Sequence, residues 1–181
     1  NAAAGHAAAG HGARRDGTIL AIDDQYLTNM GAYIRTHGAV APLGTQMYLG
    51  GPYDIRHRRS DISCVLTNTT PTGTYRGPGR FEAAFIRERI VDLVTHRLGL
   101  DPAEVRRRNF IPRDAFPYQT PVALVYDTGN YQATLDEALK LADYSGFGAR
   151  KAESERKGRL RGIGVSCYIE ACGIAPSAVV G

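Results

Sequence analysis

Residues 61–98 decide the fold, and they read DISCVLTNTTPTGTYRGPGRFEAAFIRERIVDLVTHRL. At the start of this stretch apolar and polar side chains alternate, which predicts a strand over Asp61–Asn68. At its end apolar residues recur three and four positions apart, which predicts a helix over Phe81–Leu98. The residues between are rich in glycine, proline and threonine, so they predict a loop that leads from a strand directly into a long helix.

Weaker signals place the other elements around this unit. Further strands are predicted over Thr18–Tyr26, after an Asp16-Gly17 turn, and over Leu160–Ile169. Helices are predicted from an Asp101 cap to about Arg108, over Gln132–Asp143 and over Gly148–Lys157. Turn-forming residues predict loop over 36–52 and irregular or edge structure over 110–130. Strands on both sides of a block of helices indicate an α+β fold.

Length and composition bound the class of protein. The chain has 181 residues, 43% of them apolar and 22% charged, as in an ordinary globular protein. No apolar run reaches the ~20 residues that a membrane span needs, and no secretory signal peptide is recognisable. The three cysteines, Cys64, Cys167 and Cys172, cannot all pair within the chain. We therefore expect no membrane span and a reducing, cytoplasmic location.

The two ends of the sequence lead us to expect a piece of a longer polypeptide. The chain begins without methionine and stops just after an apolar run. Residues 1–16 are a low-complexity or strand-like segment, in which we expect a frayed terminus rather than a metal site at His6 and His11. Residues 17–181 are expected to form part of one domain.

The positive charge is a weak indication of nucleic-acid binding. The net charge is +4, but the basic residues are dispersed apart from Arg56–Arg59 and Arg106–Arg108. The tyrosines do not alternate with these runs as base-stacking residues would. The run at Arg106–Arg108 is interpreted as a solvated or subunit-facing surface, and no nucleic-acid partner is expected.

The loop before the long helix is the strongest candidate for a binding site. A helix amino terminus presents unpaired N–H groups and the positive end of its dipole, which favour an anion. Gly77 and Gly79 allow a ligand to approach the backbone closely. Arg76 and Arg80 add planar charged groups suited to phosphate or another oxyanion. The structural alternative is a plain strand-to-helix turn, with its arginines in water or paired with Glu82.

The same loop carries a resemblance to a known family. Residues 75–82 (YRGPGRFE) and 98–111 (LGLDPAEVRRRNFI) resemble the molybdenum-binding large subunits of the xanthine oxidase family, in particular the bacterial, carbon monoxide dehydrogenase-like ones. Three further stretches agree in the same order: GPYDI at 51–55, YDTGNY at 126–131 and RGIGVSCYIE at 161–170. The resemblance covers nearly everything after residue 16 and corresponds to part of the region that embraces the cofactor.

This resemblance implies a molybdenum hydroxylase. Such enzymes oxidatively hydroxylate a small aldehyde or N-heterocycle at a molybdenum–molybdopterin centre, with water as the oxygen source. In bacteria the pterin is usually a cytosine dinucleotide. Electrons pass to [2Fe–2S] clusters and FAD, which a small iron–sulfur subunit and a medium FAD subunit carry. The implied assembly is a dimer of heterotrimers, with this domain in the large subunit.

The resemblance also assigns roles within the loop. Arg76 matches the arginine whose backbone lies against the molybdenum centre, and Tyr75 takes the aromatic position beside it. Gly77 and Gly79 match the close-packed glycines of the cofactor loop. The family's glutamate base has no counterpart in this chain. We therefore expect no catalytic residue in it, and no turnover by this piece alone.

Two positions depart from the purine-oxidising branch of the family. Pro78 stands where those members place a stacking phenylalanine, and Gly44 stands where they place a guanidinium that grips the substrate. Both departures argue against a purine substrate. In addition, Gly77 follows Arg76 where the carbon monoxide dehydrogenases place a copper-binding cysteine, which argues against copper-dependent oxidation.

The last stretch of the chain contributes further candidates. Ile174 belongs to a segment that lines the substrate channel in the family. Glu170 is interpreted as a strand-end carboxylate, in water or paired with an arginine, rather than as a catalytic group. Cys167 and Cys172 lack the further cysteines that an iron–sulfur cluster requires.

The sequence therefore leaves three alternative functions. The first is part of the large subunit of a molybdenum hydroxylase. The second is a catalytically silent homologue or a scaffold and binding module, which the missing base and the two substrate-pocket departures favour. The third is an anion- or RNA-binding domain, which rests on Arg56–Arg59 and the net charge.

Overall fold

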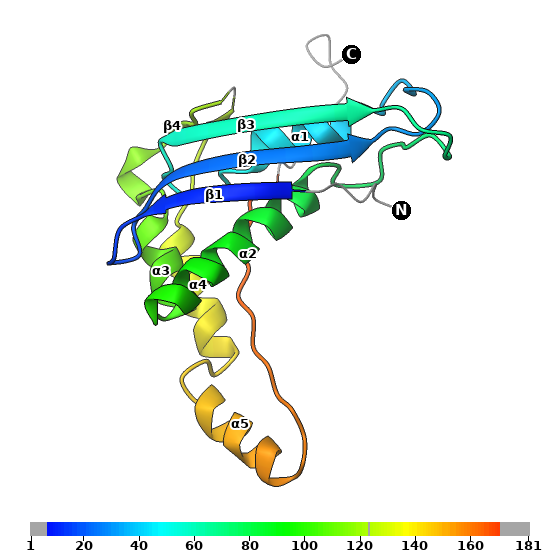
Figure 1. Ribbon diagram of the computed structural model, residues 1–181. Helices are drawn as coiled ribbons and strands as arrows, with labels where there is room; N and C mark the ends of the chain where they lie inside the picture. Colours follow the sequence, from blue (N-terminus) through cyan, green and yellow to red (C-terminus); the bar gives the residue numbers. More distant parts are fainter. Residues whose placement is uncertain (1–6, 123, 171–181) are drawn as a thin grey trace.

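A computed structural model describes residues 7–122 and 124–170 (Figure 1). Three strands form a mixed sheet in the order β1-β2-β3. β1 (Ala7–Ala13) pairs antiparallel with β2 (Ile19–Asn29), and β2 pairs parallel with β3 (His57–Val65). A parallel pair needs a crossover connection, and α1 (Val40–Tyr48) lies in that connection.

Helices cover one face of this sheet. α2 (Arg80–Leu98) packs against α1 below the strands, and α3 (Pro102–Asn109) follows it (Figure 1). The main core consists of apolar side chains from β2, the helices and their connections: Ile19, Ile22, Leu49, Tyr53, Ile55, Val91, Ala103, Val105, Phe110 and Leu135. This shared core fixes the position of α2 and α3 relative to the sheet.

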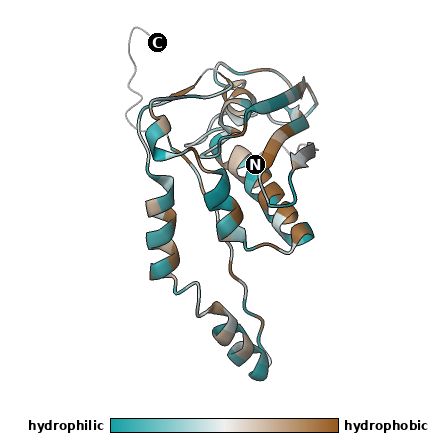
Figure 2. Cartoon of the chain, turned by 90° about the vertical axis from the view of Figure 1, so that its left-hand side faces the viewer, coloured by the Kyte–Doolittle hydropathy of each residue, from teal (hydrophilic) through white to brown (hydrophobic). Residues whose placement is uncertain are grey.

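An arm of helices extends away from the sheet. α4 (Tyr131–Leu141) packs on α3, and α5 (Phe147–Arg156) lies at the far end of the molecule (Figure 1). Residues 159–170 then run back toward the sheet. Figure 2 shows mostly hydrophilic or neutral colours on α5, whereas the most hydrophobic stretches lie nearer the sheet.

Short elements connect α3 to α4. They are a 3-10 helix (Arg113–Ala115) and the paired strands β4 (Tyr118–Gln119) and β5 (Val125–Tyr126). Over the described residues, no helix combines the length and apolar character that crossing a bilayer requires.

Most of the predicted elements are confirmed, and so is the mixed α/β class. The predicted strand at 18–26 is β2, the long helix is α2, and the two later helices are α4 and α5. The Asp101 carboxylate caps α3 by accepting hydrogen bonds from the N–H groups of Ala103 and Glu104, at 2.8 and 3.0 Å. Residues 110–130 are irregular apart from the short elements above.

The prediction of a loop over 36–52 is wrong, because α1 lies within it. Pro42 occupies the first turn of α1, where its missing N–H has no intrahelical partner to lose. Gly44 is buried against the loop before α2, where tertiary packing compensates for its low helix propensity. Neither residue therefore interrupts the helix.

Strand positions also differ from the predictions. The strand expected at 61–68 runs from His57 to Val65, because polar residues such as Ser60 face inward and hydrogen-bond to β2. Residues 7–13, within the segment expected to be frayed or strand-like, form β1.

The strand expected at 160–169 does not form. The backbone of Cys167 instead bonds to side chains of α2: its N–H donates to Glu88 at 3.0 Å, and its carbonyl accepts from Arg87 at 2.8 Å. These side chains supply to the Cys167 backbone the hydrogen bonds that a neighbouring strand would otherwise supply.

The two arginine runs do not form basic faces. Arg106 is fully buried, which contradicts its interpretation as a surface residue, because it pairs with acidic groups of α2. In the other run Arg56 pairs with Asp54, and Arg58 is half-buried and donates to the Gln46 carbonyl at 2.5 Å. The charges that suggested nucleic-acid binding are thus partly used inside the protein.

Candidate functional site

The glycine- and proline-rich loop lies where the sequence placed it, between β3 and α2. Its first half is tied to the end of β2, because the Met30 carbonyl accepts hydrogen bonds from the N–H and hydroxyl of Thr72, at 3.1 and 3.5 Å. Its second half turns into α2 through a hydrogen bond from the Arg80 N–H to the Gly77 carbonyl at 3.1 Å. The loop is therefore held at both ends.

The two loop glycines serve different purposes. Both have a φ of 78°, a conformation that glycine adopts without strain. A Cβ on Gly79 would collide with the backbone of Gly44 and Thr45 on α1, whereas a Cβ on Gly77 would have no described atom within 4 Å. Gly79 is needed for packing, and Gly77 borders open space.

Gly44, the predicted substrate-pocket residue on α1, lies directly against the loop. A Cβ at this position would come within 2.8 Å of the Pro78 carbonyl oxygen. The structure thus brings Gly44, Pro78 and Gly79 into one contact. The predicted pocket residue Ile174 lies outside the described residues, as do Cys172 and His6.

The loop side chains differ sharply in their environment. Tyr75 is 83% exposed, and Arg76 is also exposed and forms no ion pair with a described residue. Arg80, by contrast, stacks over the Tyr48 ring and pairs with Glu170 at 2.8 Å. Arg80 is thus engaged within the protein. Of the two settings expected for Glu170, water or an arginine partner, the structure shows the arginine, although no strand ends at this residue.

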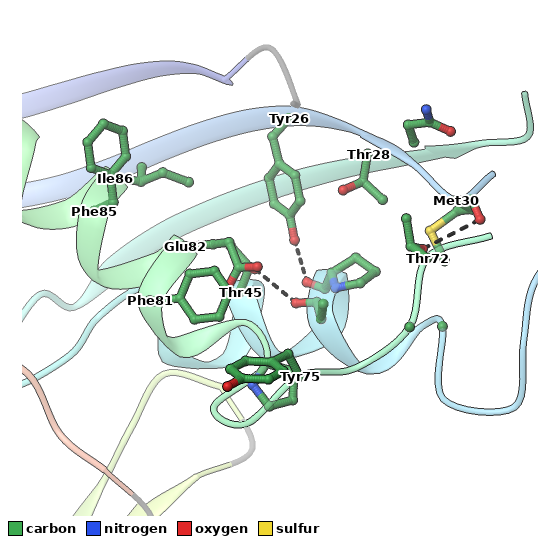
Figure 3. A pocket seen from close by; sticks show the side chains of 16 residues that line it. Tyr26, Thr28, Met30, Thr45, Thr72, Tyr75, Phe81, Glu82, Phe85 and Ile86 are labelled. Atoms are coloured by element: carbon green, nitrogen blue, oxygen red, sulfur yellow. Dashed lines mark hydrogen bonds between the residues drawn. The ribbon is translucent and has the colours of Figure 1, made fainter. Parts of the chain in front are cut away.

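A cavity of about 430 Å³ opens beside this loop (Figure 3). Its walls come from the end of β2, from α1, from the loop and from the first turns of α2. The lining residues are Tyr26, Thr28, Asn29, Met30, Gly38, Ala41, Pro42, Thr45, Thr72, Gly73, Tyr75, Pro78, Phe81, Glu82, Phe85 and Ile86. The volume suits a small organic molecule.

Hydrogen bonds fix the α1 wall of this cavity. The Tyr26 hydroxyl on β2 donates to the Pro42 carbonyl, and the Thr45 hydroxyl donates to the Ala41 carbonyl at 2.9 Å (Figure 3). Burial raises the pKa of Tyr26 well above its ordinary value, so its hydroxyl stays protonated and can donate. The cavity is therefore shaped before any ligand enters.

Glu82 is the one charged side chain among the described residues that line the cavity. Its Oε2 atom is buried and has no hydrogen-bond partner among them. Burial raises the pKa of the Glu82 carboxyl above its ordinary value, and the N–H groups of Gly79 and Glu82 offset this only in part.

A second charged cluster lies deeper, at the middle of α2. Glu88 accepts from Arg87 at 3.0 Å, from Arg106 at 2.9 Å and from the Tyr53 hydroxyl at 3.0 Å. Arg106 also pairs with Asp92 at 2.9 Å. These groups join α2, α3 and the segment after α1, so this cluster holds the body together.

No local pattern in the sequence indicated the cavity or the buried cluster directly. Phe81 and Phe85 lie one helical turn apart at the start of α2, and they are 51% and 74% exposed. In the sequence, the available signal for the cavity was a pair of aromatic residues four positions apart, next to a glycine-rich loop. Arg87 and Glu88 gave none, because adjacent opposite charges on a helix usually face solvent.

Comparison with known proteins gives one consistent result. The molybdopterin cofactor-binding domain family matches residues 3–110. The chain is 32% identical over 164 residues to the 6-hydroxypseudooxynicotine dehydrogenase complex subunit gamma of Paenarthrobacter nicotinovorans, covering 88% of this chain and 21% of that protein. It is 33% identical over 168 residues to the carbon monoxide dehydrogenase large chain of Hydrogenophaga pseudoflava, covering 90% and 21% respectively.

The fold agrees with these matches. The structure of quinoline 2-oxidoreductase from Pseudomonas putida 86 superposes with a TM-score of 0.79 at 28% identity, over 87% of this chain and 20% of that one. The chain thus spans about a fifth of the length of each of these relatives.

Proposed function

The chain belongs to the molybdopterin cofactor-binding domain family of xanthine oxidase-type enzymes, and from this premise we propose that it forms part of the cofactor and substrate site of a molybdenum hydroxylase. Its reaction would be the oxidative hydroxylation of a small aldehyde or N-heterocycle. Membership of the family supports the enzyme class, and the reaction, the substrate and the residue roles are parts of the proposal.

One observation carries the proposal. Gly77 combines a positive φ with open space around its Cβ position, directly beside a cavity of small-molecule size. Glycine adopts this φ without strain, and without a side chain it leaves the backbone of Arg76 and Gly77 open on the side of the cavity. A bulky group lying against the backbone of Arg76 and Gly77 accounts for both features.

The described residues fit a molybdenum–pterin cofactor at this point. Arg76 and Gly77 would hold it with their exposed backbone, Tyr75 would lie beside it, and Gly79 would keep the loop close to α1. No group of three or more His, Cys, Asp or Glu side chains within the described ranges could ligate a metal ion directly. A cofactor that brings its own metal ligands is compatible with such a site.

When bound, the cofactor supplies the oxidising metal and activates water, while this chain supplies shape and contacts. Pro78 and the α1 wall would bound the substrate side of the site. A proline cannot stack on a ring as a phenylalanine does, so we propose a substrate other than a purine. Copper-dependent carbon monoxide oxidation is not proposed, because Gly77 follows Arg76.

The remaining proposals concern the assembly. We propose a cytosine dinucleotide form of the cofactor, with electrons leaving to [2Fe–2S] clusters and FAD in a small and a medium partner subunit. The complete assembly would be a cytoplasmic dimer of heterotrimers. Two of the relatives are named as a subunit gamma and a large chain, which supports a multi-subunit enzyme.

Metal and cofactor analysis of the protein purified from its own host tests the proposal. We expect molybdenum and an extractable pterin dinucleotide, together with iron and FAD in co-purifying subunits. The absence of both molybdenum and pterin would overturn the proposal and favour a silent homologue or a scaffold.

A further inference from the structure

The net charge of this protein is concentrated at the far end of its arm. Residues 147–161, here called the arm tip, comprise α5 and the start of the segment that runs back to the sheet (Figure 1). They contain six arginines and lysines against two glutamates, a surplus of four positive charges. The net charge of the whole chain is also +4, so the other residues are neutral on balance. The arm tip therefore carries the entire net charge.

Ion pairs within the arm already occupy its acidic groups. Both glutamates of the arm tip are paired with lysines, at 2.6 and 3.9 Å. Arg150 pairs with Asp143, at the end of the preceding connection. Arg156 and Arg159, by contrast, are exposed and form no ion pair with a described residue. These two arginines are free to pair with carboxylates of another molecule.

An exposed leucine stands among these charges. Leu160 is 99% exposed and lies between Arg159 and Arg161 in the sequence. No described helix or strand packs extensively on α5, which extends away from the sheet (Figure 1). An apolar side chain flanked by arginines is typical of a protein–protein interface, where arginine is enriched and apolar residues are surrounded by polar ones.

Other occupants fit the arm tip less well. Nucleic-acid surfaces that stack bases need aromatic rings, and the arm tip has none after Phe147. A lipid surface needs a broad apolar face, whereas α5 is mostly hydrophilic or neutral (Figure 2). A second copy of this chain offers a body that is neutral on balance. An acidic face of a different protein fits best, because carboxylates match the planar donor group of arginine.

We propose that the arm tip docks on an acidic face of a different protein chain. Arg156 and Arg159 pair with carboxylates of that face, and Leu160 makes the apolar contact between them. This inference rests on the proposed function only in naming that chain as one of the partner subunits. The contact itself requires neither molybdenum nor substrate.

Cross-linking of the protein purified from its own host, together with the chains that co-purify, tests the inference. All three lysines of the sequence, Lys140, Lys151 and Lys157, lie on the arm. A carbodiimide joins lysine amines directly to carboxylates, so in this chain it reports mainly on contacts of the arm. We expect mass spectrometry to find Lys151 and Lys157 joined to aspartate or glutamate of another chain. Cross-links confined to this chain would overturn the inference.

Two double variants with the same change in net charge locate the contact. Arg156→Gln with Arg159→Gln acts on the arm tip, and Arg14→Gln with Arg15→Gln acts on the exposed turn between β1 and β2. We expect the first variant to retain about tenfold less of the cross-linked chain, and the second to retain as much as the original protein. Full retention by the first variant, or equal losses in both, would overturn the inference. Loss of bound nucleic acid or lipid from the first variant, in place of a protein chain, would do the same.

The same preparations separate this inference from the proposed function, because molybdenum and pterin are measured on each of them. Cross-links from the arm to another chain in protein without molybdenum and pterin would support the docking surface and contradict the hydroxylase. Molybdenum and pterin in protein whose lysines are joined only within their own chain would do the reverse.

Discussion

Two carboxylates on α2, six residues apart, differ in almost every respect. Glu88 is 6% exposed and is bonded by Arg87, Arg106, the Tyr53 hydroxyl and the Cys167 N–H. Glu82 is half-buried at the amino end of the helix, and its buried oxygen has no described partner. The carboxylate at the middle of the helix has four partners, whereas the buried oxygen at its amino end has none among the described residues.

The two carboxylates therefore have different roles on the same helix. A buried charge whose partners are all supplied by the fold stabilises the fold, and its removal leaves those partners uncompensated. A half-buried carboxyl that no described side chain balances does not stabilise the fold through its charge, because burial disfavours the ionised form. The same contrast recurs in the loop, where Gly79 is packed and Gly77 is not.

The largest effect is expected at Glu88, in the charged cluster at the middle of α2. Glu88→Gln leaves Arg106, which is fully buried, without its full counter-charge, so we expect the free energy of unfolding to fall by ~3–5 kcal/mol. Urea denaturation measures the loss. The same substitution at Glu104, whose side chain is 63% exposed, should change stability by less than ~0.5 kcal/mol. Equal losses at the two sites would contradict the role of the cluster.

A smaller difference is expected between the two glycines. Gly79→Ala introduces a Cβ that collides with the α1 backbone, in addition to the cost of its positive φ, and should cost ~3 kcal/mol. Gly77→Ala meets open space and should cost only ~1 kcal/mol. Thermal or urea unfolding of both variants gives the comparison. A reversed order would show that the space beside Gly77 is filled by the protein itself.

A still smaller effect is expected at the α1 wall of the cavity. Tyr26→Phe removes the hydrogen bond to the Pro42 carbonyl and should destabilise the protein by ~1 kcal/mol. Urea denaturation measures the loss. Unchanged stability would mean that the wall does not depend on this contact.

The smallest effect concerns pH. Burial raises the pKa of the Glu82 carboxyl in the folded protein, so the unfolded chain loses this proton first as pH rises. Ionisation of Glu82 therefore lowers stability as pH rises through its folded pKa. At pH 7 Glu82→Gln should be at least as stable as the original protein. Any gain in the free energy of unfolding should disappear at a pH where Glu82 is protonated in both the folded and the unfolded protein. Denaturation curves at pH 4 and pH 7 measure this, and a variant less stable at pH 7 would contradict it.

Local signals in the sequence were sufficient for β2, α2, α3 and the loop between β3 and α2. The Asp101 cap and the spacing of apolar residues in α2 are local signals, because each depends on residues only a few positions apart in the sequence. α1 could not be predicted in this way, because Gly44 and Pro42 are tolerated only through their position in the helix and their contact with the loop.

The burial of charged side chains could not be predicted from the sequence either. Arg106 stands in a run of three arginines and has the same local context as its neighbours. Only the arrangement of α2 and α3 brings it to Glu88 and Asp92. The strand expected at 160–169 failed for a related reason, because Arg87 and Glu88 satisfy its backbone at Cys167.

The most direct test of the cofactor site compares occupancy with stability in Gly77→Val. The full chain and the variant are expressed in the native host, and molybdenum and pterin per chain are measured together with the free energy of unfolding. Because the position borders open space, we expect a large loss of molybdenum and pterin with a stability loss of only ~1–2 kcal/mol. Full cofactor content in the variant, or a loss of cofactor only in proportion to unfolding, would contradict a cofactor held against this backbone.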